Sequence, residues 1–163
     1  MQDVFKKILG IDFGDFTIGL AIFDEKTNFT FPYKTLYRSK ANILRKSIRE
    51  IIEIIFDEKI TQVVIGYPLN FDGTEGERVK KTKVFAEMLA KKIDALEERT
   101  GKKVEIDFQD ERLTTIEAKD ILKGHGVKAK DYKTIIDQVA AEVIINDYVN
   151  NRGKKWVKIK IIL

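Results

Sequence analysis

The 163-residue chain contains no cysteine and only one histidine. These absences exclude disulfide bonds and thiolate metal ligands, and a single imidazole does not make an ordinary zinc site. A metal ion in this protein would therefore be held by oxygen atoms, the ligands that Mg²⁺ and Mn²⁺ prefer. Such a site needs acidic side chains that folding brings together.

Long apolar segments are also missing. The chain has no apolar run of the roughly eighteen residues that a membrane-spanning helix requires. Residues 1–14 lack the charged, apolar and small-residue pattern of a secretory signal. We therefore expect a cytoplasmic protein with no membrane partner, and a length of 163 residues suits one α/β domain.

Basic side chains gather at the C-terminal end. Residues 152–163 hold five of the thirty Lys and Arg residues and no acid, so the remainder, with twenty-five basic and twenty-six acidic residues, is near neutral. We expect one domain over 1–152 and a basic tail or edge strand over 153–163. Lysines that alternate with apolar residues fit a protected sheet edge as well as phosphate contact. A second basic segment, 119–133, is predicted to be a mobile loop around His125.

Apolar spacing and turn residues predict an α/β fold that opens with an antiparallel meander and continues with a strand, helix, parallel strand unit. The predicted elements, in chain order, are strands at 6–13, 16–24 and 29–37, a helix over 43–55, a strand at 62–66, a helix over 74–99, a strand at 104–109 and a helix over 135–149.

Two capping boxes predict where helices begin. Thr74 and Glu77 have the spacing that opens the long helix over 74–99, and Thr114 with Glu117 has the same spacing after the strand at 104–109. The second box predicts a short helix that starts just beyond Glu111.

Three acids stand in unusual settings. Asp12 lies inside an apolar strand, and Glu111 lies at the carboxyl end of the strand at 104–109, where open α/β sheets place ligands. Asp137 shares a helix face with Ala140 and Ala141, and these small residues let the helix approach the sheet. Burying an acid costs free energy through desolvation, and a bound divalent cation offsets that cost.

Such a trio can hold two cations about 3.5–4 Å apart, which activate a water and stabilise the leaving oxygen of a phosphodiester. A simpler interpretation exists for Glu111 and Asp137, because acids are common as caps and turn residues near helix starts. It applies less readily to Asp12, which lies in mid-strand.

Four ordered segments carry a family resemblance. They are GIDFG at 10–14 with IGLA at 18–21, VIGYPLN at 64–70 running into DGTEG at 72–76, DERLTT at 110–115, and IDQVAA at 136–141. With these segments, over most of residues 7–150, the chain resembles the YqgF family of RNase H-like proteins. That family is described as similar to Holliday junction resolvases and as nucleases of pre-16S ribosomal RNA.

The resemblance implies an RNase H-like three-layer fold, with a five-stranded mixed sheet flanked by helices. It also implies a metal-dependent endonuclease that uses two Mg²⁺ or Mn²⁺ ions. The implied catalytic and metal-binding residues are Asp12, Glu111 and Asp137. The implied nucleic-acid-binding residues are Asn70, Gly73, Thr74, Arg112 and Thr114.

The substrate expected from the resemblance is structured RNA, in 5′-end processing of pre-16S ribosomal RNA in the small ribosomal subunit. A four-way DNA junction is the alternative, and two symmetric cuts would then need a dimer, for which the sequence shows no clear face. A non-catalytic RNA-binding assembly factor is a further alternative, because a fold does not guarantee its chemistry. An actin-like ATP-binding protein shares Gly-Ile-Asp-x-Gly, but it would need a second lobe for which the chain is too short.

Local alternatives remain around the expected substrate contacts. The glycine turn at 70–74 can offer backbone amides to a phosphate or be a plain turn. Arg112 can clamp a phosphate or pair with the neighbouring acids. The first hairpin departs from the family pattern, because Asp15 and Phe16 stand where members often carry Thr and Lys. An acid there weakens the case for phosphate contact by this hairpin.

Overall fold

The computed structural model describes residues 5–38, 44–112, 120–128 and 132–151. The elements, in chain order, are β1 (Lys7–Phe13), β2 (Thr17–Asp24), β3 (Phe29–Tyr37), α1 (Leu44–Asp57), β4 (Gln62–Tyr67), α2 (Glu77–Thr100), β5 (Glu105–Asp110) and α4 (Tyr132–Asn150). The predicted meander and the predicted order of strands and helices are confirmed, with most boundaries shifted by one to three residues.

The five strands form one mixed sheet in the order β3-β2-β1-β4-β5. β1 pairs antiparallel with β2, and β2 pairs antiparallel with β3. β4 pairs parallel with β1, and β5 pairs parallel with β4. The carboxyl ends of β1, β4 and β5 therefore meet at one edge of the sheet, which we call the acidic rim because Asp12 and Glu111 lie there.

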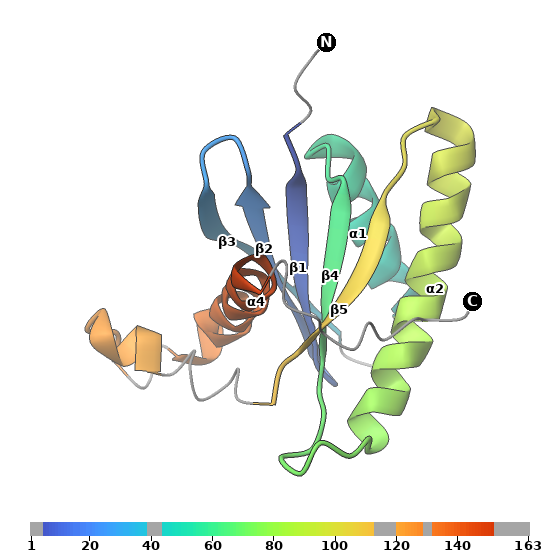
Figure 1. Cartoon of the computed structure of the whole chain (residues 1–163). Coiled ribbons are helices and arrows are strands. Elements are labelled where there is room, and N and C mark those ends of the chain that lie inside the picture. The colour runs from blue at the N-terminus through green and yellow to red at the C-terminus, as the bar shows by residue number, and fades with distance from the viewer. Residues whose placement is uncertain (1–4, 39–43, 113–119, 129–131, 152–163) are drawn as a thin grey trace.

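Helices cover both faces of the sheet (Figure 1), with α4 on one face and α1 and α2 on the other. Side chains alternate between the faces along each strand. In β1, Leu9 and Ile11 join the larger core with α1 and α2, whereas Ile8 joins the smaller core under α4. Asp12 has the same parity as Ile8, so it faces α4.

The first predicted capping box is wrong. α2 begins at Glu77, and its N-cap is Gly76, which forms no side-chain capping hydrogen bond. The Thr74 hydroxyl instead donates to Asp72 Oδ1 over 2.6 Å, so this threonine stabilises the preceding turn and not the helix. The second box, Thr114 with Glu117, lies outside the described residues.

The predicted basic loop at 119–133 is partly wrong. Residues 120–124 are helical, and Leu122 on this turn is buried. An apolar side chain that packs on the core fixes the segment despite its charge. His125 is exposed in the turn that follows. The predicted C-terminal tail or edge strand, 153–163, lies outside the described residues. In the described part of the chain, no helix is long and apolar enough to cross a membrane.

Candidate active site

Asp12 and Asp137 meet across a glycine of the sheet. Asp12 lies near the end of β1 and is paired with Gly19 of β2, so both residues point to the face that α4 covers. A side-chain carbon on Gly19 would overlap the backbone carbonyl of Asp137 and would lie 2.8 Å from its Cβ. The missing side chain therefore lets α4 rest on the sheet with Asp137 beside Asp12.

Glu111 reaches the same place from the far side of β4. Its backbone amide donates to the carbonyl of Tyr67 over 3.1 Å, which carries the parallel pairing one residue past β5. A side-chain carbon on Gly66 would lie 2.7 Å from both Cδ and Oε2 of Glu111. The carboxylate thus lies over Gly66 on β4, the strand next to β1, and it meets Asp12 there.

Burial dominates the electrostatics of the two carboxylates. It raises the pKa of Asp12 to about 6, and the negative charge of Asp137 adds to the rise. Burial also raises the pKa of Glu111 well above its usual value, and the charge of Asp12 and a hydrogen bond with Asp12 add to it. That hydrogen bond lowers the pKa of Asp12. Folding therefore disfavours the state in which Asp12 and Glu111 are both ionised.

The pair fits a divalent cation in its chemistry. Glu111 Oε1 is buried and has no hydrogen-bond partner, so one carboxylate oxygen is desolvated without compensation. Asp12 and Glu111 are the residues that would hold such a cation, and it would offset the cost of burying their charge. Among the described residues, however, no three Asp, Glu or His side chains already stand close enough to hold a metal ion together. Asp137 lies beside Asp12, but the three acids do not form a ready-made metal site.

Arg78 is a site residue that the sequence interpretation missed. It lies in the first turn of α2, is exposed, and its positive charge lowers the pKa of both Asp12 and Glu111. α2 begins directly after the 70–76 loop, and this brings its first turn to the acidic rim. Nothing in the sequence distinguished this arginine from its many basic neighbours. The two glycines under the acids did carry a signal, because glycine inside a strand marks close approach.

The 70–74 turn is closed by its own hydrogen bonds. The amide of Gly73 donates to the carbonyl of Asn70 over 2.8 Å, and the amide of Thr74 donates to Asp72 Oδ1 over 2.9 Å. The side-chain amide of Asn70 donates to the Thr74 hydroxyl over 3.0 Å. The backbone amides of Gly73 and Thr74 are therefore already hydrogen-bonded within the turn. Of the two alternatives that the sequence left open, this matches the plain turn and not a phosphate-binding one.

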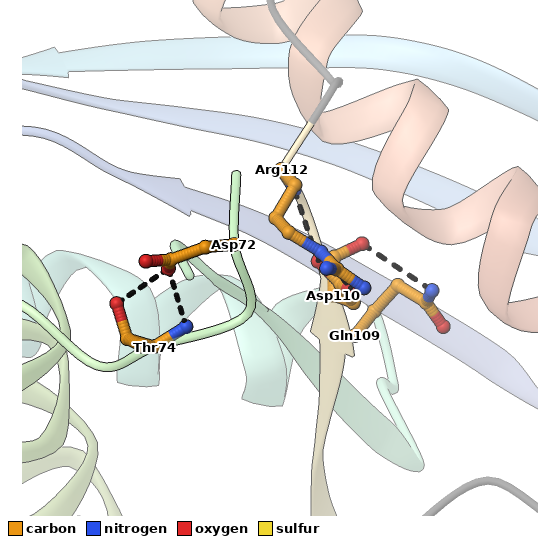
Figure 2. A network of polar contacts seen from close by, with 5 residues as sticks. All are labelled: Asp72, Thr74, Gln109, Asp110 and Arg112. Carbon is orange, nitrogen blue, oxygen red and sulfur yellow. Dashed lines mark hydrogen bonds and ion pairs between the residues drawn. The ribbon is translucent and has the colours of Figure 1, made fainter. Parts of the chain in front are cut away.

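Arg112 lies beside this turn and pairs with Asp110. Figure 2 shows the guanidinium on the carboxylate, with Nε 2.9 Å and Nη2 2.8 Å from Asp110 Oδ2. A side-chain carbon on Gly73 would lie 3.5 Å from Arg112 Nη1, so the turn and the arginine form one surface. Of the predicted nucleic-acid-binding residues, Asn70, Gly73, Thr74 and Arg112 are together, and Thr114 lies outside the described residues.

The first hairpin is fixed by two basic residues from elsewhere in the chain. Lys81 of α2 forms an ion pair with Asp15 over 3.1 Å, with both side chains exposed. The buried Arg38 donates to the carbonyls of Gly14 and Asp15. Phe16 at the tip is 69% exposed. The acid that departs from the family pattern is therefore neutralised by Lys81.

Comparison with known proteins identifies the family. A family model described as "RuvX: Holliday junction resolvase" matches residues 6–151. The chain belongs to the RuvX family. The family match spans all three acids and all the described rim residues, and it confirms the resemblance seen in the sequence segments.

RuvX relatives from two bacteria match the chain over nearly their whole length. A protein of Lachnospira eligens is 39% identical over 148 residues, covering 91% of this chain and 99% of the relative. A protein of Carboxydothermus hydrogenoformans is 38% identical over 148 residues, with the same two shares. Both carry the name of a proposed pre-16S rRNA nuclease.

Solved structures confirm the fold. The T. thermophilus RuvC in complex with Holliday junction substrate has a TM-score of 0.53 at 11% identity, covering 90% of this chain and 94% of that one. The fowlpox virus Holliday junction resolvase has a TM-score of 0.51 at 14% identity, covering 90% and 99%. At these identities the likeness shows a shared fold, and the RNase H-like sheet predicted from the sequence is confirmed.

Proposed function

We propose that this RuvX chain is a metal-dependent endonuclease that hydrolyses phosphodiester bonds in 5′-end processing of pre-16S ribosomal RNA, in the cytoplasm. One observation carries the proposal: the carboxylate of Glu111 lies over Gly66 and meets Asp12, with Asp137 beside Asp12 and with Glu111 Oε1 buried without a partner. Burying neighbouring acids is costly unless a cation joins them. The proposed substrate, pre-16S ribosomal RNA, is taken from the names of the Lachnospira eligens and Carboxydothermus hydrogenoformans relatives.

Asp12, Glu111 and Asp137 would hold Mg²⁺ or Mn²⁺, and we propose two ions with Asp12 shared between them. Bound cations of this kind activate a water and neutralise charge that develops on the phosphoryl oxygens. The unpartnered Oε1 of Glu111 supports its assignment as a ligand. The pKa values of Asp12 and Glu111 are raised, so protons would compete with a cation for these carboxylates.

The side chains around the acids are suited to holding a phosphodiester. Arg78 brings positive charge to Asp12 and Glu111, which lowers the electrostatic cost of a phosphate beside two acids. Arg112 presents a flat guanidinium on the surface formed with Gly73. On the family resemblance we assign nucleic-acid contact to Arg112, Asn70, Gly73 and Thr74, although the amides of Gly73 and Thr74 are engaged within the turn and Arg112 pairs with Asp110. Thr114 is assigned on the family resemblance.

A four-way DNA junction is the second candidate substrate, because the matched family model is described as a Holliday junction resolvase. A non-catalytic RNA-binding factor is the third, because the described residues hold no preformed three-acid metal centre. Both candidates keep nucleic acid as the partner and differ from the proposal in substrate or in chemistry.

The deciding experiment compares cleavage of a labelled 16S precursor and a labelled four-way DNA junction. Each substrate is incubated with Mn²⁺, with Mg²⁺, with EDTA, and with the Asp12→Asn variant. The proposal expects cation-dependent cutting of the precursor that Asp12→Asn abolishes. Preferential cutting of the junction would indicate that the substrate is a four-way DNA junction and not the RNA precursor. Binding of RNA without any cutting, unchanged in Asp12→Asn, would leave the non-catalytic factor.

A further inference from the structure

A basic groove lies between α1 and α2, on the sheet face opposite the acids. It has a volume of about 690 Å³, and no acidic residue lines it. Ile48, Met88 and Leu96 supply apolar surface. The charged residues of its lining are Arg45 and Arg49 from α1 and Lys91, Lys92 and Arg99 from α2. All five are exposed, and we call this set the groove cations.

The groove cations differ from the basic residues near the acidic rim. Near the rim, Lys81 pairs with Asp15, Lys83 pairs with Glu75, and Arg112 pairs with Asp110. In the described ranges of the chain, none of the groove cations forms an ion pair. Five unneutralised charges on facing helices repel one another, and bound anions would relieve that repulsion.

The spacing of the groove cations suits a row of anionic groups. On α2, Lys91 and Arg99 are two turns apart, which is about 12 Å along the axis. Arg45 and Arg49 are one turn apart on the facing helix. A single small anion would contact only some of these charges, whereas a nucleic-acid backbone offers a phosphate about every 3.4 Å along a duplex strand.

α2 connects the groove to the proposed active site. Its first turn carries Arg78, whose charge acts on the acids, and its second half lines the groove. Arg78 and Lys91 are thirteen residues apart on this helix, which corresponds to about 20 Å. A duplex would extend about six base pairs from the scissile phosphate to cover that distance.

We propose that the groove between α1 and α2 is a second nucleic-acid site, which binds the phosphate backbone of the substrate away from the cleaved bond. This inference rests on the proposed function only in taking nucleic acid as the partner. It implies that the protein prefers long structured substrates over short ones. Most of the extra affinity is electrostatic, so it falls steeply with salt.

The test measures binding in EDTA, where no cleavage interferes. Labelled RNA hairpins with stems of about 5 and about 18 base pairs are titrated at several salt concentrations. The variants are Lys91→Gln/Lys92→Gln and Arg45→Gln/Arg49→Gln, since glutamine keeps the helix propensity of the exposed residues it replaces. Lys26→Gln/Lys34→Gln is the matched control, because both lysines are exposed on the β2–β3 hairpin and the same charge is removed.

Each groove variant is expected to weaken binding of the long hairpin at least fivefold and to reduce the salt slope by about two, with little effect on the short hairpin. Equal loss in the control and groove variants, or equal loss on both hairpins, would overturn the inference. Binding of labelled polyglutamate is measured in parallel. If the groove variants lost polyglutamate binding but kept RNA binding, the inference would also be overturned, because the groove would then fit an acidic protein partner. Cleavage is scored separately, so a failed nuclease assay leaves the binding result standing.

Discussion

The carboxylate of Glu111 occupies the space above Gly66 that a side chain at position 66 would need. A Cβ on Gly66 would lie 2.7 Å from Glu111 Cδ and 2.6 Å from Ile144 Cδ1. One glycine thus admits both a proposed metal ligand, Glu111 just after β5, and an apolar contact from α4. The position couples the site to the packing of the helix that carries Asp137.

Gly66→Ala is expected to destabilise the fold by about 1–3 kcal/mol through overpacking. It should also lower nuclease activity more than tenfold, because displacement of a catalytic group by about 1 Å is costly. Urea unfolding and cleavage rates measure the two effects. Gly124→Ala is the matched control, since nothing lies within 4 Å of a Cβ there. An unchanged cleavage rate in Gly66→Ala would remove Glu111 from the proposed site.

Asp12→Asn is expected to stabilise the cation-free protein at pH 7–8. The pKa of Asp12 is about 6 in the folded protein and near 3.8 when unfolded. Between these values the unfolded chain binds fewer protons, so stability falls as pH rises from about 4 to about 6. The asparagine variant lacks this loss, which for the shift of about two units is at most about 3 kcal/mol. Thermal unfolding in EDTA across pH 4–8 tests it, and parallel curves would contradict it.

Mg²⁺ is expected to raise the melting temperature more at pH 7.5 than at pH 5. Asp12, with a pKa of about 6, takes up a proton in acid, and burial also raises the pKa of Glu111, so bound protons must leave before a cation binds. Ligand binding then stabilises the folded state by mass action. Thermal unfolding with and without Mg²⁺ at both pH values measures the difference, and Asp12→Asn should abolish it.

Arg78→Gln is expected to move the acidic limb of the pH–rate profile to higher pH. The arginine lowers the pKa of Asp12 and Glu111, so its removal leaves both carboxyls protonated over a wider range. Cleavage near pH 6 should fall severalfold, with a smaller loss at pH 8. Lys80→Gln, in the same turn but paired with Glu77, should leave the profile in place. A uniform loss at all pH values would indicate substrate binding alone.

Asp15→Asn is expected to tighten nucleic-acid binding by about two- to fivefold. The change removes a negative charge from the first hairpin and releases Lys81 from its ion pair for phosphate contact. Both partners are exposed, so stability should change by less than about 0.5 kcal/mol. Affinity at two salt concentrations measures the gain. Asp15→Asn combined with Lys81→Gln should lose it, and equal affinity of the single variant and wild type would exclude phosphate contact by Lys81.

The sequence predicted the sheet well because its strands carry short-range signals. Short apolar runs bounded by turn residues marked β1 and β4, whereas the approach of Asp137 to Gly19 and of Glu111 to Gly66 was not predicted. The start of α2 was mispredicted because a Thr-x-x-Glu spacing does not reveal that Thr74 prefers a turn partner, Asp72.

Arg78 and the groove cations were beyond the sequence for a different reason. Charged residues along a helix have no distinguishing pattern until the neighbouring elements are placed. The position of α2 relative to β1 and β5 decides that Arg78 acts on buried acids, whereas Lys80, two residues later, pairs with Glu77. Long-range packing, absent from local spacing, determines which basic residue matters.

The apolar cores on the two faces of the sheet differ in size, and this difference has a consequence for motion. α1 and α2 bury a large apolar cluster on one face of the sheet, while α4 rests on a smaller cluster that includes Ala141 and Ile144. Partial opening of a protein follows its least buried packing. Amide hydrogen exchange should therefore be faster in α4 than in β1 and β4. Asp137 would move with that helix, and the candidate site could widen while the main core stays intact.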